Sequence, residues 1–334
     1  MRRTDRKRPT SRPGGALVVA AAAAVFALTA TGCATGAAGT PVPGAPDCPI
    51  TPSDSFWHAD VRGLPVHTSS STWVTSIGAT GRLKADFGSG LWDGGPIGIP
   101  YTVIPGSQPL VDVELGYDDS DPGPYRVPAA PNIEGGPDAD GDRHVLLVDR
   151  DRCELSELWD SHPNGDGTWY AGSAARFDLR SNAMRTAGAT SADAAGLPIL
   201  PGLVRYEEVA AGRIDHAIRI TVPRTADRYV WPASHEAGSG GADTPPMGAW
   251  LRLKASVDES RFDPAVRPII VALKTHGAVV ADNGSAWYLS GAPDDRWDND
   301  ELATLRNVRG SDFEVVDAGR LRVAPDSYQA RPTG

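Results

Sequence analysis

Short apolar runs separated by turn-forming residues constrain the fold of this chain more than any other feature. The 334 residues include 37 glycines and 29 prolines. Most apolar stretches are short and end at a Gly, Pro or Asp, which is typical of β-strands. The expected strands are 144–149, 153–159, 168–179, 202–209, 216–222, 249–255, 278–281 and 286–289.

Turn and helix signals complete this expectation. Asn164–Gly167 is a strong hairpin turn signal, because Asn-Gly and Asp-Gly pairs accept positive φ. Helices are expected at 263–277, which opens with Asp263-Pro264, and at 298–308, which has acidic residues in its first turn. We therefore predict a mainly β fold with an antiparallel β-sandwich or jelly-roll-like core and two short helices near the C-terminus.

The N-terminus has the layout of a bacterial secretory signal that ends in a lipoprotein cleavage box. An apolar stretch, 16–28, leads to Ala30-Thr31-Gly32-Cys33. Thirteen apolar residues are too few to cross a bilayer, which takes ~20. The prediction is cleavage after Gly32 and a lipid on Cys33, which places the protein on the extracytoplasmic face of the cell membrane. A cleaved signal with an unmodified Cys33 is the alternative.

Composition divides the chain into four parts. Residues 1–32 are the expected signal peptide. Residues 33–47, rich in Ala, Gly, Pro and Thr, are expected to form a lipidated flexible tether, because such residues supply no core. Residues 48–318 are expected to form a single β-rich domain, and 319–334 a frayed tail.

The charge of the chain limits its partners. The formal net charge is −10, and the expected signal peptide removes more basic than acidic residues. An acidic surface repels phosphate backbones, so nucleic acid is not an expected partner. The expected contacts are a membrane, through the N-terminal lipid, and a glycan. The sequence identifies no protein partner.

The three cysteines fit an oxidising compartment. With Cys33 acylated, Cys48 and Cys153 remain, and they are predicted to form a disulfide. Such a bridge closes a loop of about 100 residues, which the chain-entropy treatment values at about 4–5 kcal/mol.

Sequence motifs for metals and cofactors are weak or absent. Asp138, Asp140 and Asp142 resemble the start of a calcium loop with Asp149 at its twelfth position, but Arg143 stands where such a loop needs glycine. A solvated acidic turn is the favoured interpretation, and no metal is expected. The sequence contains no nucleophile elbow, no His-Glu-x-x-His and no phosphate-binding glycine loop, so no cofactor is expected.

Five polar residues are the candidates for catalysis. Asp193 lies in a small, apolar stretch, where a carboxylate needs partners or shifts its pKa. Arg205, Glu207 and Arg219 are expected on neighbouring strands, where they would line a polar face. His235 lies in an expected loop beside an acidic residue. Structural roles explain each of them as well.

Aromatic residues are the candidates for sugar binding, because a pyranose ring stacks on a π surface. The chain has nine Trp and eight Tyr. Those near turns in the C-terminal half are Trp231, Trp287, Tyr288 and Trp297. Core filling is the default role of most Trp.

Five segments together resemble a family of exported bacterial proteins with no established activity. They are 119–125 (DSDPGPY), 141–149 (GDRHVLLVD), 190–208 (TSADAAGLPILPGLVRYEE), 245–254 (PPMGAWLRLK) and 281–291 (ADNGSAWYLSG). The resemblance covers roughly residues 70–316 and implies no catalytic residue. The family tends to have Tyr at the place of His276, which argues against a catalytic role for His276.

Two functional hypotheses follow. The first is a membrane-anchored extracytoplasmic lipoprotein that binds or processes carbohydrate, as a hydrolase or lyase if it is an enzyme. The second is a non-catalytic module of the cell envelope. An open groove with two carboxylates within ~5–10 Å of each other and a flanking aromatic would favour the first.

Overall fold

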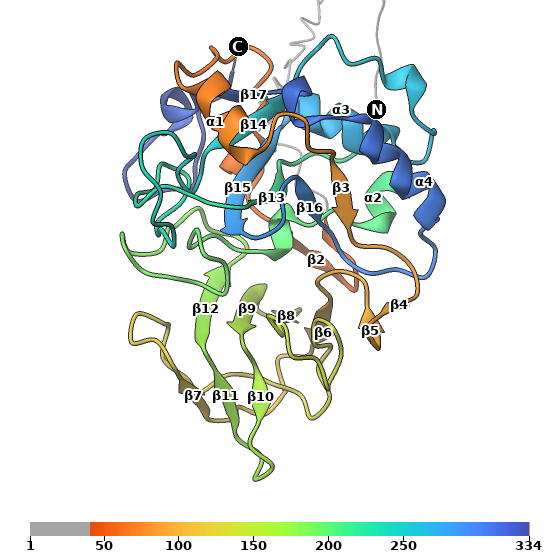
Figure 1. Ribbon diagram of the computed structural model, residues 1–334. Coiled ribbons are helices and arrows are strands. Elements are labelled where there is room, and N and C mark those ends of the chain that lie inside the picture. The colour runs from red at the N-terminus through yellow and green to blue at the C-terminus, as the bar shows by residue number, and fades with distance from the viewer. Residues whose placement is uncertain (1–40, 334) are drawn as a thin grey trace, which may run out of the picture. The chain divides into compact units, whose positions relative to one another are not determined.

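The computed structural model describes residues 41–333, which are strand-rich (Figure 1). The largest sheet has six strands in the order β17-β14-β15-β13-β16-β3. Its strands are β3 (Lys84–Asp86), β13 (Ile218–Val222), β14 (Trp250–Leu253), β15 (Ala278–Asn283), β16 (Tyr288–Ser290) and β17 (Phe313–Val316). The sheet is mixed, because β13 pairs with β15 and β16 pairs with β3 in parallel.

The second large sheet has four strands in the order β12-β9-β8-β6. Its strands are β6 (Tyr101–Ile104), β8 (Val145–Asp149), β9 (Glu154–Trp159) and β12 (Ser173–Asp178). β8 is buried on both faces: Leu146 packs in one apolar cluster and Leu147 in another. Such burial explains why β8 is continuously apolar rather than alternating.

Three small sheets complete the strands. Their strands are β1 (Pro41–Val42) with β2 (Ala45–Pro49), β4 (Leu91–Trp92) with β5 (Gly95–Pro96), and β10 (His162–Pro163), β11 (Trp169–Ala171) and β7 (Val113–Leu115). The predicted hairpin turn at 164–167 is confirmed, since it joins the antiparallel β10 and β11.

Four α-helices are present among residues 41–333, and they are not confined to the C-terminal part. They are α1 (Ser70–Ile77), α2 (Tyr206–Ala210), α3 (Arg267–Thr275) and α4 (Asn299–Ala303). Six short 3-10 turns lie at 56–58, 200–202, 259–261, 304–307, 310–312 and 319–321. The predicted helices at 263–277 and 298–308 correspond to α3 and α4, and Asp298 caps α4 by accepting from the backbone of Asp300.

Two expectations about secondary structure need correction. The three larger sheets are mixed rather than antiparallel, and neither a sandwich nor a jelly roll is confirmed. The stretch 202–209 is not a strand: it contains α2, whose start is fixed by the Glu208 carboxylate accepting from the backbone N–H of Arg205 at 3.2 Å. A glutamate at this position of a first helical turn is half of a capping box.

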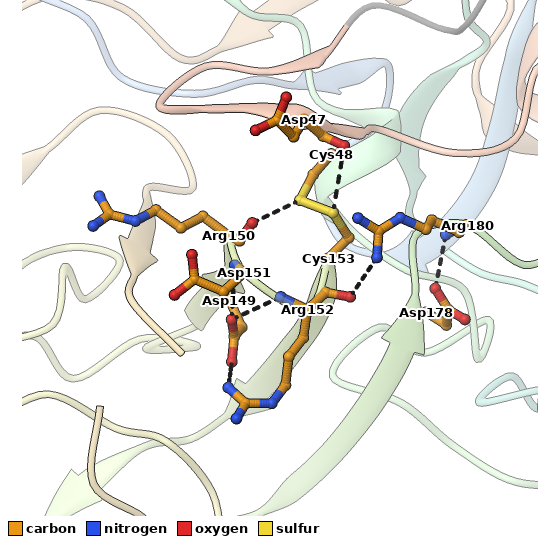
Figure 2. Close-up of a disulfide and its surroundings, with 9 residues drawn as sticks. All are labelled: Asp47, Cys48, Asp149, Arg150, Asp151, Arg152, Cys153, Asp178 and Arg180. Carbon is orange, nitrogen blue, oxygen red and sulfur yellow. Dashed lines mark hydrogen bonds and ion pairs between the residues drawn. A yellow bond between two sulfur atoms is a disulfide. The ribbon is translucent and has the colours of Figure 1, made fainter. Parts of the chain in front are cut away.

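The predicted disulfide is confirmed. Cys48 in β2 is bonded to Cys153, which follows the tight turn after β8 (Figure 2). The Asp149 carboxylate holds this turn, because it accepts from the backbone N–H groups of Asp151 and Arg152 and from the Arg152 guanidinium. Both half-cystines are fully buried, so the bridge fastens the β1–β2 hairpin to the four-stranded sheet.

Both ends of the described chain are packed. Residues 41–47, assigned above to the tether, form β1 and the start of β2, and Val42 and Ala45 are buried. In the expected tail, Tyr328 is buried and its carbonyl accepts from the backbone of Phe56 at 2.7 Å. The signal peptide and Cys33 lie outside the described residues. No helix within 41–333 has the length and apolarity needed to span a membrane.

Candidate functional site

A cavity of about 280 Å³ gathers the segments that the sequence analysis singles out. Four of the five quoted segments line it, through Asp119, Asp142, Thr190–Ala192 with Ala194, and Asp282 with Asn283. Tyr117, Trp159, Ser173, His235 and Ala237 complete the lining. Larger hollows of about 690 and 790 Å³ border loop 183–187, where Arg185 is paired with Asp121 at 2.5 Å.

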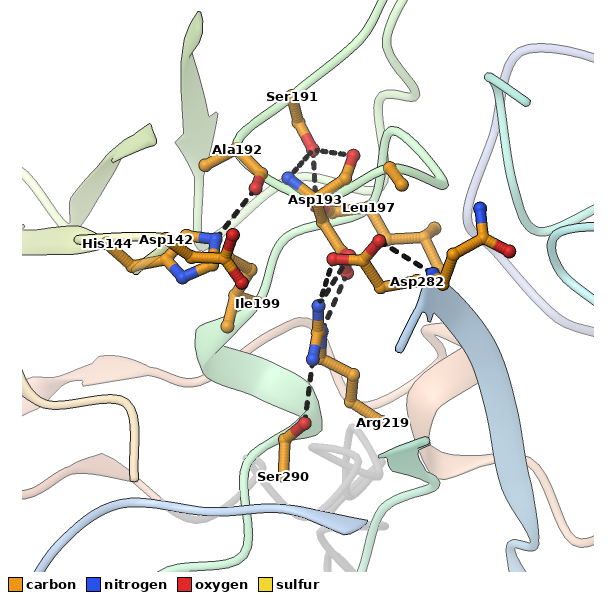
Figure 3. A network of polar contacts seen from close by, with 12 residues as sticks. Asp142, His144, Ser191, Ala192, Asp193, Leu197, Ile199, Arg219, Asp282 and Ser290 are labelled. Atoms are coloured by element: carbon orange, nitrogen blue, oxygen red, sulfur yellow. Dashed lines mark hydrogen bonds and ion pairs between the residues drawn. The ribbon is translucent and has the colours of Figure 1, made fainter. Parts of the chain in front are cut away.

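A buried ion network lies behind one wall of this cavity and reaches its lining at Asp282. β13 places Ile218 and Ile220 in the core and Arg219 on the opposite face. The Arg219 guanidinium donates to both oxygens of Asp193 at 2.9 and 3.2 Å and to Asp282 at 2.9 Å (Figure 3). It also donates to the Ser290 hydroxyl at 2.7 Å. All its contacts lie within the protein, so Arg219 is not free to bind a ligand.

Asp193 is held in place by the same network. Its side chain is 1 % exposed, and burial raises its pKa to about 6 although the Arg219 charge opposes this shift. The backbone of its loop is fixed by Ser191, whose hydroxyl accepts from the Asp193 N–H at 2.9 Å. The two sequence candidates Asp193 and Arg219 are therefore brought together, in a structural pair behind the cavity wall.

A second ion pair lies beside this network. His144, just before β8, is almost fully buried, and its Nε2 donates to the Ala192 carbonyl at 3.0 Å. Its Nδ1 lies 2.5 Å from the Glu134 carboxylate. Burial lowers the pKa of His144, but the charge of Glu134 outweighs this effect and raises it to about 9. Burial acts to raise the pKa of Glu134, but the His144 charge has the larger, opposite effect, so the pKa of Glu134 is lowered. At neutral pH the pair is an imidazolium and a carboxylate.

Asp142 lies close to Glu134, and the Glu134 charge also acts on Asp86. One oxygen of Asp142 lies within 4.8 Å of a Glu134 oxygen and of a His144 ring nitrogen. Asp86, at the end of β3, pairs in register with Ser290. Asp86 is an exposed residue, and its side chain makes no hydrogen bond to another residue of 41–333. Burial nevertheless raises the pKa of Asp86, and the Glu134 charge adds to this shift.

Aromatic side chains stand next to these carboxylates. The Trp159 indole donates to Asp142 at 3.2 Å. The ring of Tyr117, which is 53 % exposed, lies 6.2 Å from the Trp159 ring with a tilt of 37°. The lining thus combines an accessible aromatic pair with the carboxylates of Asp119, Asp142 and Asp282, and includes no Lys or Arg among the described residues.

The cluster of Glu134, Asp142 and His144 has the residue types of a metal site, but its hydrogen bonds argue against one. The Ala192 carbonyl can only accept, so Nε2 of His144 carries a proton, and Nδ1 is engaged by Glu134. A metal ligand needs an unprotonated ring nitrogen. His144 would therefore have to give up one of its two partners.

The acidic turn that resembles a calcium loop carries its own cation. The buried Arg143 guanidinium donates to the backbone carbonyls of Pro137 and Ala139, at 2.9 and 2.8 Å, and to Ser161 at 2.9 Å. Carbonyl oxygens of this kind are ligands of Ca²⁺ in calcium loops, and here the Arg143 guanidinium occupies them. Asp138 and Asp140 are exposed, so Asp142 alone of the three aspartates reaches the cavity.

Two predicted catalytic residues lie elsewhere. Arg205 pairs with Glu208 in another buried cluster, where Glu208 also contacts His216 Nε2 at 3.2 Å. Burial raises the pKa of Glu208, but the Arg205 and His216 charges outweigh it and lower it to about 2. Glu207 points to the surface and pairs with Arg296. Arg205, Glu207 and Arg219 do not share a polar face, because residues 206–210 form a helix rather than a strand.

His235, a candidate from the sequence, lies at the cavity. It lines the pocket, and its Nδ1 contacts the Ala194 carbonyl at 2.8 Å. The four aromatic residues that were candidates for sugar binding do not line this cavity. Trp231, Trp287 and Trp297 are at most 8 % exposed, and each indole N–H donates to a backbone carbonyl. Tyr288 accepts from Lys84 at 2.8 Å. These four residues pack the body of the protein and do not line the cavity.

Sequence patterns do not identify Glu134, Asp86, Tyr117 or Trp159 as site residues. Glu134 and Asp86 lie in or next to Gly-rich loops without a motif. Trp159 had one usable signal: it ends an apolar strand and is followed by Asp160 and a turn, where an aromatic ring is often accessible. Comparison with known protein families, with curated proteins and with solved structures finds no match to this chain.

Proposed function

We propose that the protein binds a neutral or positively charged glycan in this cleft and hydrolyses it. Asp142, Trp159 and Tyr117 form the sugar-binding surface, and Glu134 and Asp86 act as base and acid. The observation that carries the proposal is the Glu134–Asp142 carboxylate pair, with oxygens within 4.8 Å, next to the accessible Trp159–Tyr117 pair. Carboxylate and aromatic groups together bind sugar hydroxyls and the apolar face of a pyranose.

The environments of Glu134 and Asp86 favour opposite protonation states. The His144 imidazolium lowers the pKa of Glu134, whereas burial and the Glu134 charge raise the pKa of Asp86. Two carboxyl groups whose pKa values are shifted in opposite directions are suited to act as an acid and a base. Asp86 donates a proton to the glycosidic oxygen as its bond to the anomeric carbon breaks. Glu134 accepts a proton from the water that attacks this carbon, and solvent restores both groups.

The negative charge of the cavity lining supports a neutral or positively charged glycan as the ligand. The lining contributes three carboxylates and no Lys or Arg among the described residues, and the Arg219 charge is occupied by Asp193 and Asp282. Anionic sugars would meet like charges with no compensating cation. Neutral sugars and amino sugars do not face this repulsion.

A glycan array followed by a hydrolysis assay tests the proposal. The sample is the chain from residue 33 with Cys33→Ser. Wild-type cleft residues should bind neutral or amino-sugar glycans and release reducing ends, and Trp159→Ala should weaken binding. Glu134→Gln and Asp86→Asn should abolish release, whereas the surface variant Glu207→Gln should not. Failure to bind any glycan would refute the proposal, and binding without release would support the non-catalytic module instead.

We also propose that Cys33 carries the lipid that anchors the protein outside the cytoplasm. The described domain begins with β1 at Pro41, so the eight residues from Cys33 can hold it within about 30 Å of the bilayer surface. Radiolabelled palmitate should label the protein and should not label the Cys33→Ser variant. Equal labelling, or recovery of the unchanged chain from the cytosol, would contradict this assignment.

A further inference from the structure

Most side chains that line the cavity of about 280 Å³ use their hydrogen-bond donors within the protein. The hydroxyl groups of Ser173 and Thr190 donate to the Ser191 carbonyl at 2.7 and 3.2 Å. The Ser191 hydroxyl donates to backbone carbonyls of its own loop. The Trp159 indole donates to Asp142 at 3.2 Å. These four donors are therefore not free for a ligand.

The amide of Asn283 is also held within the protein. It donates to the Ala237 carbonyl at 3.2 Å and accepts from the Thr225 hydroxyl at 3.0 Å. The hydroxyl of Tyr117, a residue that is 53 % exposed, can donate as well as accept. The side-chain donors of the lining that remain for a ligand are thus this hydroxyl and the second N–H of Asn283.

Carboxylate acceptors, by contrast, remain open on the same lining. Asp119 accepts from the Thr190 N–H at 2.8 Å through one oxygen, and Asp142 accepts from the Trp159 indole through one oxygen. The second oxygen of each makes no hydrogen bond to another residue of 41–333, and neither carboxylate forms an ion pair within these residues. The His144 imidazolium, within 4.8 Å of Asp142, is engaged by Glu134. Both carboxylates can therefore bind a donor that a ligand brings.

His235 adds a further acceptor to the lining. Its Nδ1 lies 2.8 Å from the Ala194 carbonyl. A carbonyl oxygen can only accept, so Nδ1 carries a proton, and Nε2 of the neutral ring is an acceptor. Nε2 makes no hydrogen bond to another residue of 41–333. The polar groups that the lining side chains leave open are therefore mainly acceptors.

The charge and the aromatic rings of the lining both favour a cation. Asp119, Asp142 and Asp282 contribute three carboxylates, and the lining includes no Lys or Arg among the described residues. The rings of Trp159 and Tyr117 lie 6.2 Å apart, and the face of an aromatic ring attracts an ammonium ion. An ammonium group has three donors and no acceptor, so it matches a lining whose open side-chain groups are mainly acceptors.

We propose that the sugar unit in this cavity carries a free ammonium group, which the carboxylates of Asp119 and Asp142 bind. This inference rests on the proposed function and narrows its substrate to glycans with free amino sugars. The volume of about 280 Å³ lies at the small end of ligand pockets, so the cavity holds one sugar unit. An N-acetyl group would replace the charge by a neutral amide and add a carbonyl acceptor to a site that is poor in donors. A hydroxyl group would bring one donor and no charge.

Three tetrasaccharides with the same β-1,4 linkage test the inference, because they differ only at carbon 2 of each unit. Glucosamine carries an ammonium there, N-acetylglucosamine an amide and glucose a hydroxyl. Affinities of the Cys33→Ser chain are measured at an ionic strength of about 0.15 M, where charge attraction is screened beyond ~8 Å. The glucosamine chain should bind about tenfold more tightly than the other two, which is the effect of one hydrogen bond to a charged group.

Two variants locate this preference in the cavity. Asp119→Asn and Asp142→Asn each remove a negative charge but keep an oxygen that accepts from the Thr190 N–H and from Trp159, respectively. Each should weaken binding of the glucosamine chain about five- to tenfold and leave the other two ligands and the Tm unchanged. Asp138→Asn is the matched control, because it removes the same charge from an exposed residue outside the lining. It should change none of the affinities.

The outcomes separate this inference from the proposed function. Equal binding of the three tetrasaccharides, or a preference that survives both cavity variants, would overturn the amino-sugar assignment while leaving glycan binding intact. A preference that Asp138→Asn weakens as much would reflect the overall charge and would overturn it as well. Spermine, which has as many amino groups as the glucosamine tetrasaccharide but no sugar ring, should bind more weakly; equal or tighter binding would show that the amine alone is recognised. Absence of binding to every sugar and on the glycan array would overturn the proposed function and this inference with it.

Discussion

Removing the buried guanidinium of Arg219 should destabilise the fold by an amount that depends on pH. In Arg219→Met, the carboxylate of Asp193, 1 % exposed, loses both of its hydrogen bonds from the guanidinium, and Asp282 loses one. Breaking a buried ion pair by removing one partner costs about 3–5 kcal/mol. We expect a loss of this size in the free energy of unfolding at pH 7.

The pH dependence follows from protonation of Asp193. Its pKa is about 6 in the folded protein against an ordinary value of 3.8, so at pH 7 it is ionised. Without Arg219 the pKa rises further, and the variant binds a proton between pH 7 and 6 that the wild type does not bind. One pH unit corresponds to about 1.4 kcal/mol. Below pH 6 both proteins carry this proton, so the loss should be about 1.4 kcal/mol smaller at pH 5 than at pH 7.

Urea unfolding at pH 5 and pH 7 measures this effect. Arg296→Met is the matched control, because Arg296 is 52 % exposed and also bonds two carboxylates; an exposed pair contributes about 0–1 kcal/mol. Asp193→Asn combined with Arg219→Met should cost less than the sum of the two single changes. A loss below about 1 kcal/mol at pH 7, an equal loss at both pH values, or strict additivity would refute the reasoning.

Three further predictions concern the pair beside the cavity, the disulfide and the aromatic residues. At pH values below 6.5, His144→Gln should lower the Tm, because the imidazolium of His144 then forms its ion pair with Glu134. The difference in Tm should disappear as the pH rises through about 9, the raised pKa of His144, because the imidazole loses its charge there. A difference in thermal unfolding that does not depend on pH would contradict this. Replacing Cys48 and Cys153 by Ala should cost about 4–5 kcal/mol in urea unfolding, and an unchanged midpoint would contradict the stabilising role of the bridge. Trp159→Ala should weaken glycan binding about five- to tenfold with little change in Tm, whereas Trp287→Ala should cost about 3–5 kcal/mol in stability; the reverse pattern would show that Trp159 is a core residue.

Local patterns were sufficient to predict about half of the strands described within residues 41–333, and none of those before residue 144. β8, β9, β13 and β14 follow from short apolar runs bounded by turns, and the hairpin at 164–167 follows from its glycines. The disulfide follows from cysteine number and compartment. Sheet order does not follow from such patterns, because the parallel pairing of β13 with β15 joins segments about sixty residues apart.

The site was predictable only in part. Asp193 and Arg219 were singled out because a buried charge needs a partner, and they are partners of each other. Glu134 was not predictable because its partner His144 is ten residues away and the pair forms only in the fold. The effect of the Glu134 charge on Asp86 likewise depends on the fold and not on a local pattern. Indole burial is likewise a tertiary property: Trp287 and Trp159 are both near turns, but only the first is enclosed by the core.

The most direct test of the central claim is the release of reducing ends from a bound glycan by the wild type and by Glu134→Gln. The account predicts turnover by the wild type and a rate at least about a hundredfold lower in the variant, the usual contribution of a general base, with glycan affinity changed less than about threefold. Equal rates, or loss of binding in a variant of unchanged Tm, would contradict the assignment of Glu134 as the base of a glycan-hydrolysing cleft.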